Sequence, residues 1–185
     1  MSPSTILPGI QPPSDINMVV EIPYGGPPVK YELDKVSGRL MVDRVLKTPM
    51  HYPGNYGFIP GTLSQDGDPM DVLLCDKTQL MPGAVINCRP VGVLLMEDEA
   101  GMDEKVIAVP SPSVSPEFDK IVDIEDLTET QRNQIEYFFK HYKDLENGKW
   151  VEIIRWGSSA HARELIIESI GLAEMTSMPP LNLAI

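Results

Sequence analysis

Short apolar segments separated by glycine and proline run along the chain from Met18 onwards and predict a series of β-strands. The expected strands are residues 18–22, 29–33, 39–45, 70–75, 84–96, 105–109 and 150–156. Residues 1–16 are rich in proline and serine, and we expect them to form an arm that lies over the surface. No internal repeat is visible in the sequence.

Apolar positions take a helical spacing in two later segments. Thr128 and Gln131 have the spacing of a capping box, so a helix is expected to start there. Its buried face should carry Ile135, Phe138, Phe139 and Tyr142. A second helix is expected to start near Ser158 or Ser159 and to end before the proline pair at 179–180. Its buried face should carry Ala162, Leu165, Ile166 and Ser169.

Many short strands followed by two helices predict an α+β domain that is mainly β, with a small closed β-barrel and helices packed outside it. The length of 185 residues fits a single domain over residues 1–185 with a substantial core. Apolar residues make up 42% and charged residues 23%, which is typical of a globular protein. The order of the strands is not readable from this pattern.

Composition also indicates a cellular compartment and argues against two classes of partner. The longest apolar runs are too short to span a bilayer, and no signal peptide is visible, so a cytoplasmic protein is expected. Cys75 and Cys88 lie in apolar surroundings and are expected to be reduced core residues. The net charge of −12 argues against nucleic acid or an anionic membrane as partner.

The acidic segment 66–72 is the most informative stretch of the sequence. Asp66, Asp68 and Asp71 lie within six residues, and Gly67 and Pro69 favour a tight turn in which the carboxylates converge. Converging carboxylates repel one another unless a cation lies between them, and hard oxygen ligands favour Mg²⁺, Mn²⁺ or Ca²⁺ over zinc. A solvated acidic turn is the plain alternative. The spacing does not match an EF-hand loop and fits the aspartyl-phosphate phosphatases poorly.

A second acidic cluster occupies residues 97–105, between two expected strands. It is either a solvated hairpin loop or a segment that brings Asp98 and Asp103 over ions held by the first turn. Cationic and phenolic side chains accompany the acids. Lys30 and Glu32 project from the same side of one strand, Arg44 lies on another, and Tyr142-Lys143 ends the first helix. Residues 52–60 read as a rigid aromatic loop.

Four segments together closely resemble the soluble inorganic pyrophosphatases of the bacterial type. They are EIPYG at 21–25, KYE at 30–32, HYPGNYGFIP at 51–60 and DGDPMDV at 66–72, and the likeness runs from about Glu21 to Lys143. The resemblance implies an OB-like, five-stranded closed β-barrel flanked by two main helices. It also implies a magnesium-dependent hydrolase that splits pyrophosphate into two phosphates by attack of a metal-activated water, and a cytoplasmic homohexamer.

The resemblance also implies a role for each acidic, cationic and phenolic residue of these segments. Several Mg²⁺ ions, with Mn²⁺ or another divalent ion as a substitute, would be held by Asp66, Asp71, Asp98 and Asp103. Phosphate oxygens would contact Lys30, Arg44, Tyr56, Tyr142 and Lys143. Supporting positions would be Glu21, Glu32, Tyr52 and Lys105. Asp68 is our choice for the general base or for the group that orients the attacking water, since its neighbours are better placed to bind metal.

A charge count indicates why metal would be required. The seven carboxylates and four cations named above give the empty pocket a net charge of about −3. Three or four divalent ions would bring this net charge to about +3 to +5. Pyrophosphate and phosphate are therefore the expected ligands. Two alternatives stay open, a phosphohydrolase acting on organic diphosphates and a non-enzymatic cation-binding module. An OB-type nucleic-acid binder is disfavoured by the charge and by the 6% of aromatic residues.

Overall fold

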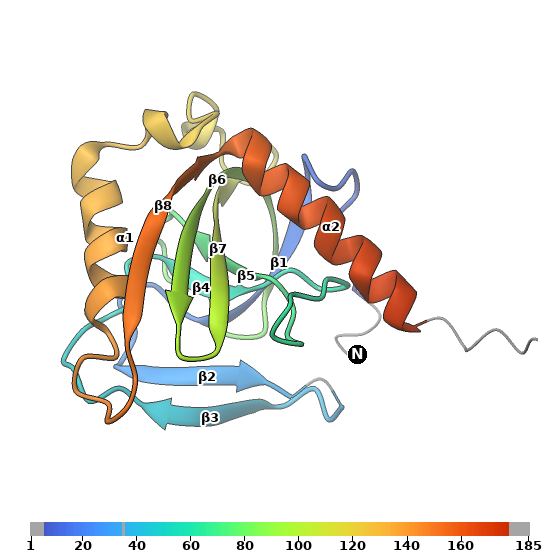
Figure 1. The fold of residues 1–185 in the computed structure, drawn as a ribbon. Coiled ribbons are helices and arrows are strands. Elements are labelled where there is room, and N and C mark those ends of the chain that lie inside the picture. The colour runs from blue at the N-terminus through green and yellow to red at the C-terminus, as the bar shows by residue number, and fades with distance from the viewer. Residues whose placement is uncertain (1–5, 35, 178–185) are drawn as a thin grey trace, which may run out of the picture.

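The computed structural model describes residues 6–34 and 36–177, which form a mainly-β fold with two α-helices (Figure 1). The strands are β1 (Ile16–Ile22), β2 (Val29–Leu33), β3 (Leu40–Val45), β4 (Asn55–Phe58), β5 (Asp71–Leu74), β6 (Val85–Asp98), β7 (Gly101–Pro110) and β8 (Val151–Ser158). The helices are α1 (Glu129–His141) and α2 (Ser159–Ser177), preceded by the short 3₁₀ helices η2 (Pro116–Phe118) and η3 (Ile124–Asp126). The predicted mainly-β α+β class is confirmed.

Strand pairing joins segments that are far apart in the sequence. The larger sheet has the order β1-β4-β5-β7-β6-β8, and β1 also pairs with β6. β5 and β7 run parallel, with Asp71 beside Lys105, whereas the other pairs are antiparallel. β2 and β3 form a separate two-stranded sheet that lies across the turn between β6 and β7 (Figure 1). The end of the β6–β7 hairpin therefore faces the β2–β3 sheet.

The two helices cover different parts of the sheet, and their sequence signals are confirmed. Thr128 and Gln131 form the capping box of α1, and the helix buries Ile135, Phe138 and Phe139. In α2, which ends at Ser177, the side chains of Ala162, Ile166 and Ser169 are buried and Leu165 is partly buried. The proline pair at 179–180 lies outside the described residues. Neither helix is long and apolar enough to cross a bilayer, within the part of the chain that is described.

The segment 52–60, predicted to be a rigid aromatic loop, is corrected by the structure. It contains β4, which lies between β1 and β5 and is buried throughout. Gly57 permits this placement, because a Cβ atom at this position would lie 1.9 Å from the carbonyl oxygen of Val19 on β1. A fully buried strand of four residues shows no alternation of polar and apolar side chains, so its pattern resembled that of a packed loop.

Two further boundaries differ from the prediction. Residues 97–105 are the paired ends of β6 and β7 joined by a tight turn, so most of the segment is strand and not loop. Glu97, Glu99 and Met102 are exposed, whereas Asp98 and Lys105 are buried. Ile16, predicted to be the last residue of the N-terminal arm, is a fully buried member of β1. Residues 1–5 of that arm lie outside the described residues. Residues 6–15 are tied to β1 by a hydrogen bond from Asn17 N–H to Pro8 O of 2.7 Å.

Both cysteines are free and buried. Burial raises the pKa of the Cys75 thiol to about 12 and shifts that of Cys88 in the same direction. A thiol with so high a pKa carries almost no thiolate near neutral pH, and thiolate is the reactive form. The prediction of reduced core cysteines agrees with this packing.

Candidate active site

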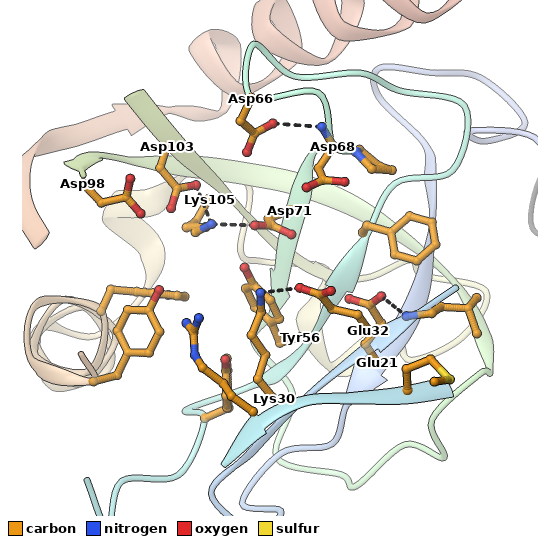
Figure 2. A pocket seen from close by; sticks show the side chains of 18 of the residues that line it. Glu21, Lys30, Glu32, Tyr56, Asp66, Asp68, Asp71, Asp98, Asp103 and Lys105 are labelled. Atoms are coloured by element: carbon orange, nitrogen blue, oxygen red, sulfur yellow. Dashed lines mark hydrogen bonds and ion pairs between the residues drawn. The ribbon is translucent and has the colours of Figure 1, made fainter. Parts of the chain in front are cut away.

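A cleft of about 550 Å³ opens where the end of the β6–β7 hairpin faces the β2–β3 sheet, and it collects every site residue predicted from the sequence (Figure 2). β1 to β4 and the loop before β4 contribute Glu21, Lys30, Glu32, Arg44, Tyr52 and Tyr56. The acidic turn and the strands β5 to β7 contribute Asp66, Asp68, Asp71, Asp98, Asp103 and Lys105. Tyr142 and Lys143 complete the lining directly after α1.

The acidic turn is shaped by its own local contacts. Gly67 has a φ of +92°, in the region that glycine adopts without strain. The Asp66 carboxylate accepts a hydrogen bond from Asp68 N–H at 3.0 Å, and Ser64 N–H donates to Asp68 O at 2.7 Å. Asp66 and Asp68 are exposed at the rim of the cleft, whereas Asp71 opens β5 and is partly buried. The turn thus spreads its three carboxylates from the rim towards the floor (Figure 2).

Lys105 binds two carboxylates from neighbouring strands. Its Nζ lies 2.5 Å from Asp71 Oδ2 and 2.5 Å from Asp103 Oδ1, and its side chain is only 5% exposed. Burial by itself would lower the pKa of Lys105, but the attraction of Asp71 and Asp103 is stronger, and the pKa is raised well above its ordinary value. Lys105 is therefore a permanent ammonium group at the centre of the acidic cluster (Figure 2).

Lys143 has a similar buried position on the other side of the hairpin end. Its Nζ lies 2.6 Å from Asp98 Oδ2 and 3.6 Å from Glu99 Oε1. Glu99 in turn pairs with Lys149, on the loop that leads into β8. Lys143, the second residue after α1, is thus tied to the end of the β6–β7 hairpin through the carboxylates of Asp98 and Glu99.

The β2–β3 sheet supplies two further cations. Lys30 Nζ lies 2.5 Å from Glu32 Oε1 and 3.5 Å from Asp43 Oδ2. Arg44 Nη1 lies 3.7 Å from the same Asp43 oxygen, and Arg44 Nε lies 3.4 Å from Glu146 Oε1. These two cations face the aspartates across the cleft, and each is paired with a carboxylate of its own part of the site.

Tyr56 and Tyr142 also line the cleft. Burial is the main reason that the pKa of each phenol is raised well above its usual value, and nearby carboxylates add to the shift. Both hydroxyl groups therefore remain protonated at any physiological pH, which makes them hydrogen-bond donors. Lys105 Nζ also lies 5.8 Å from the centre of the Tyr56 ring.

Glu21 is a buried carboxyl group whose charge is disfavoured. Burial raises its pKa from 4.5 to about 7, against the effect of the hydrogen bond from Leu33 N–H, which is 2.7 Å long. Asp71 and Glu32 raise the pKa further by repulsion. Burial also raises the pKa of Asp103. Eight carboxyl groups and four cationic side chains line the cleft, so its acids outnumber its cations.

Glu21→Gln is expected to remove part of the pH dependence of stability. Between pH 4.5 and about 7 the folded protein keeps a proton on Glu21 that the unfolded chain releases, so the free energy of unfolding falls as pH rises through this window. Glutamine keeps the acceptor for Leu33 N–H without the charge. Relative to wild type, the variant should gain up to about 3 kcal/mol above about pH 8 and nothing below about pH 4.

Urea unfolding of the metal-free protein at both pH values measures this difference. Glu164→Gln on the exposed side of α2 is the matched control and should follow the wild-type profile. The same pH profile for Glu21→Gln and wild type would contradict the assignment.

Sequence reasoning missed several residues of the cleft and its rim. Asp34 lines the cleft after β2, and Asp43 and Glu146 pair with its cations. The apolar lining not predicted consists of Leu33, Val36, Met41, Phe58, Pro69 and Phe139. Asp34 stands two residues after Glu32, so strand alternation could have indicated it, whereas no local pattern pointed to Glu146.

A separate cavity of about 780 Å³, more apolar in character, is lined by Tyr52, Met50, His51, Tyr137 and Phe138 among others.

The donor set fits a hard divalent cation. Carboxylate oxygens from the acidic turn, β5, β6 and β7 face one cleft. Burial is the main cause of the raised pKa values of Glu21 and Asp103, and repulsion from Asp71 adds to both. Among the residues described, no three Asp, Glu, His or Cys side chains are close enough together to hold an ion as they stand. Lys105 instead lies between Asp71 and Asp103, with both carboxylates within hydrogen-bond distance.

Comparisons with known proteins bear on this site. A family model described as inorganic pyrophosphatase matches residues 18–174. An inorganic pyrophosphatase of Brucella melitensis is 57% identical over 166 residues, which cover 90% of this chain and 94% of the relative. A crystal structure from Anaplasma phagocytophilum, described as an inorganic phosphatase, superimposes with a TM-score of 0.90 at 47% identity and covers 91% of this chain and 99% of its own.

A further solved structure agrees with these matches. The inorganic pyrophosphatase of Thermus thermophilus superimposes with a TM-score of 0.89 at 41% identity, covering 94% of this chain and 99% of its own. The resemblance seen in the sequence motifs is thereby confirmed over most of the chain. The chain belongs to the inorganic pyrophosphatase family.

Proposed function

We propose that this protein hydrolyses pyrophosphate to two phosphates, with the cleft between the β6–β7 turn and the β2–β3 sheet as its active site. The observation that carries the proposal is that one cleft collects the cluster of aspartates together with cationic and phenolic side chains. A tetra-anionic substrate needs both cationic side chains and metal ions, and only the combined site supplies places for both. A simple cation-binding module would not need Lys30, Arg44, Tyr142 and Lys143.

Divalent cations, Mg²⁺ first among them, would be held by aspartate oxygens. Asp66, Asp71 and Asp103 would hold the first ion, with Asp71 shared with a second, and Asp98 and Asp103 would bind ions that arrive with the substrate. A bound divalent ion supplies Lewis acidity, which lowers the pKa of water and neutralises phosphate charge. Because all these ligands are oxygens, Mn²⁺ would be able to replace Mg²⁺, and zinc is disfavoured.

Cationic and phenolic side chains of the cleft would bind and orient the phosphates. Lys30, Arg44 and Lys143 would contact phosphate oxygens through charge-assisted hydrogen bonds. Tyr56 and Tyr142 would donate their hydroxyl protons, which the raised pKa values keep in place. Glu21, Glu32, Tyr52 and Lys105 would support these groups. Holding the substrate in one orientation lowers the entropic part of the barrier.

Asp68 would accept the proton of the attacking water or orient it. The Asp68 side chain is exposed at the rim of the cleft, in the same turn as Asp66 and near Asp71. A carboxylate that is not engaged with metal can take a proton, whereas a metal-bound carboxylate has lost most of its basicity. We therefore assign the base to Asp68 and metal binding to its neighbours.

Phosphate release from pyrophosphate by the purified protein tests the proposal. The assay is run with Mg²⁺, with excess chelator, and with ADP in place of pyrophosphate. We expect release only from pyrophosphate with Mg²⁺, and tight pyrophosphate binding only with Mg²⁺. Equal activity or binding in excess chelator would rule out the metal-dependent account, since the bare cleft carries a net negative charge.

A phosphohydrolase acting on organic diphosphates is the second candidate function. The cavity of about 780 Å³ favours it, because Tyr52 lines both this cavity and the acidic cleft, and an organic group would need such an apolar space. Lys30, Arg44 and Lys143 do not line this second cavity, which makes the organic-diphosphate function the weaker candidate. Faster release from ADP than from pyrophosphate would favour it over the main proposal.

We further propose that the chain is one domain over residues 1–185 built on a closed five-stranded barrel. The additional β1–β6 pairing supports closure, since it joins the two ends of the run β1-β4-β5-β7-β6 and leaves β8 as an extension. The resemblance of the sequence motifs is the basis for expecting a cytoplasmic homohexamer. The net charge of −12 supports a protein that binds neither nucleic acid nor anionic membranes.

A further inference from the structure

The ion pair between Arg44 and Glu146 differs from the other ion pairs of the cleft. Arg44 lies on β3, and Glu146 lies in the turn segment after α1. Arg44 Nε and Glu146 Oε1 are 3.4 Å apart, both atoms are buried, and neither has a hydrogen-bond partner. A buried charge without a hydrogen bond is costly unless an opposite charge lies beside it. The two buried atoms therefore compensate each other, while the Arg44 side chain as a whole is 27% exposed.

Glu146 is held in a well-defined position by its own backbone. Its N–H donates to Lys143 O at 2.8 Å, and its carbonyl accepts from Lys149 N–H at 3.2 Å. The Glu146 side chain is 11% exposed, whereas Glu125, in an ion pair at the surface, is 79% exposed. Glu146 thus belongs to the same short turn as Lys143, one of the cations of the cleft.

This contact joins two parts of the site that share no strand pairing. β2 and β3 form a sheet of their own, and Arg44 belongs to it, while Lys143 follows α1. Besides the ion pair, Thr48 Oγ1 donates to Tyr142 O across the same junction, at 3.4 Å. Asp43 is the other carboxylate near Arg44, but it is more exposed, at 32%, and it is shared with Lys30. Glu146 is therefore the more buried anchor of the guanidinium group.

We propose that Glu146 is a positioning residue that fixes Arg44 in the orientation needed to bind phosphate. The inference rests on the proposed function, in which Arg44 contacts phosphate oxygens. By holding Nε from the turn after α1, Glu146 restricts the rotamers of a long side chain and leaves the outer guanidinium nitrogens for the substrate. An ordered side chain loses less entropy when it binds its ligand, so affinity rises without any new contact to the ligand.

Glu146→Gln tests this directly, because glutamine has nearly the same shape and lacks the charge. We expect KM for pyrophosphate with Mg²⁺ to rise about tenfold, which corresponds to about 1.4 kcal/mol, while kcat changes less than about twofold. Calorimetric binding of methylenediphosphonate, a non-hydrolysable diphosphonate, should weaken by the same factor. Glu125→Gln, which breaks the exposed pair with Arg132, is the matched control and should leave both values unchanged.

A double-mutant cycle separates positioning from general support of the fold. In an Arg44→Ala background, Glu146→Gln should have no further effect on KM, because the group it positions is absent. If the glutamine variant does not fold, Glu146→Asp provides the same comparison, because its shorter side chain keeps the charge but withdraws the carboxylate from Arg44.

Two results would overturn the inference while leaving the proposed function intact. One is an unchanged KM for Glu146→Gln in an active enzyme, and the other is an equal rise in KM with and without Arg44. A wild-type protein that fails to hydrolyse pyrophosphate would overturn both proposals.

Discussion

Asp68→Asn is expected to lower kcat for pyrophosphate about a thousandfold, within the range found for loss of a general base. Asparagine has the size of aspartate but accepts no proton at neutral pH, so the attacking water loses the group that receives its proton. The side chain is exposed at the cleft rim, so the substitution should leave folding intact. Turnover with Mg²⁺, Mg²⁺ binding by calorimetry and the thermal unfolding midpoint should be measured together.

Asp34→Asn is the matched control for this experiment. Asp34 is another carboxylate that lines the cleft, and its side chain accepts a hydrogen bond from Ser37 N–H at 2.6 Å. We expect its removal to change kcat by less than about threefold, because a general base must contact the attacking water. Near-normal turnover for Asp68→Asn would reassign the base to another carboxylate. Loss of Mg²⁺ binding in that variant would instead make Asp68 a metal ligand.

Lys105→Met is expected to destabilise the metal-free protein by about 3 kcal/mol, because one partner of a buried ion pair is removed. Asp71 and Asp103 would then face each other without the ammonium group that lies 2.5 Å from each. Methionine fills a similar volume, so the loss would report the charge and not a cavity. Saturating Mg²⁺ should return more stability to the variant than to wild type, since the ion neutralises the same carboxylates.

Urea unfolding with and without Mg²⁺, at one protein concentration, measures both parts of this prediction. Arg132→Met is the control, because Arg132 pairs with Glu125 at the surface, where such pairs contribute less than about 1 kcal/mol. Equal destabilisation of the two variants would mean that Lys105 does not hold the carboxylates together. A Mg²⁺ effect no larger than in wild type would mean that these carboxylates do not bind the ion.

Much of the candidate site could be predicted because its signals are local. The acidic turn is recognisable from a few consecutive residues, because a glycine stands among three aspartates. In the structure this glycine, Gly67, has a positive φ. Helix α1 shows in its capping box and in the spacing of Ile135, Phe138 and Phe139. The family resemblance added a role for Tyr56, within the motif at 51–60, and for Lys105, at the end of the second acidic cluster.

Other parts of the molecule had no local signal. β4 is too short and too buried to show alternation, so it was predicted to be a loop. Glu146 carries no motif, and its importance follows from a contact with Arg44 in a distant strand. In the same way, the extent of β6 and β7 depends on how the two strands pair, and the predicted loop between them is a tight turn.

The sequence by itself determined the types of residue that meet in this protein and the boundaries of its most regular elements. Turn chemistry, helix caps and apolar spacing act over a few neighbouring residues, so they can be read along the chain. Only the tertiary structure decided which of these residues meet. Asp71 and Lys105 are 34 positions apart and become neighbours through the parallel pairing of β5 with β7, whose register depends on packing of the whole sheet.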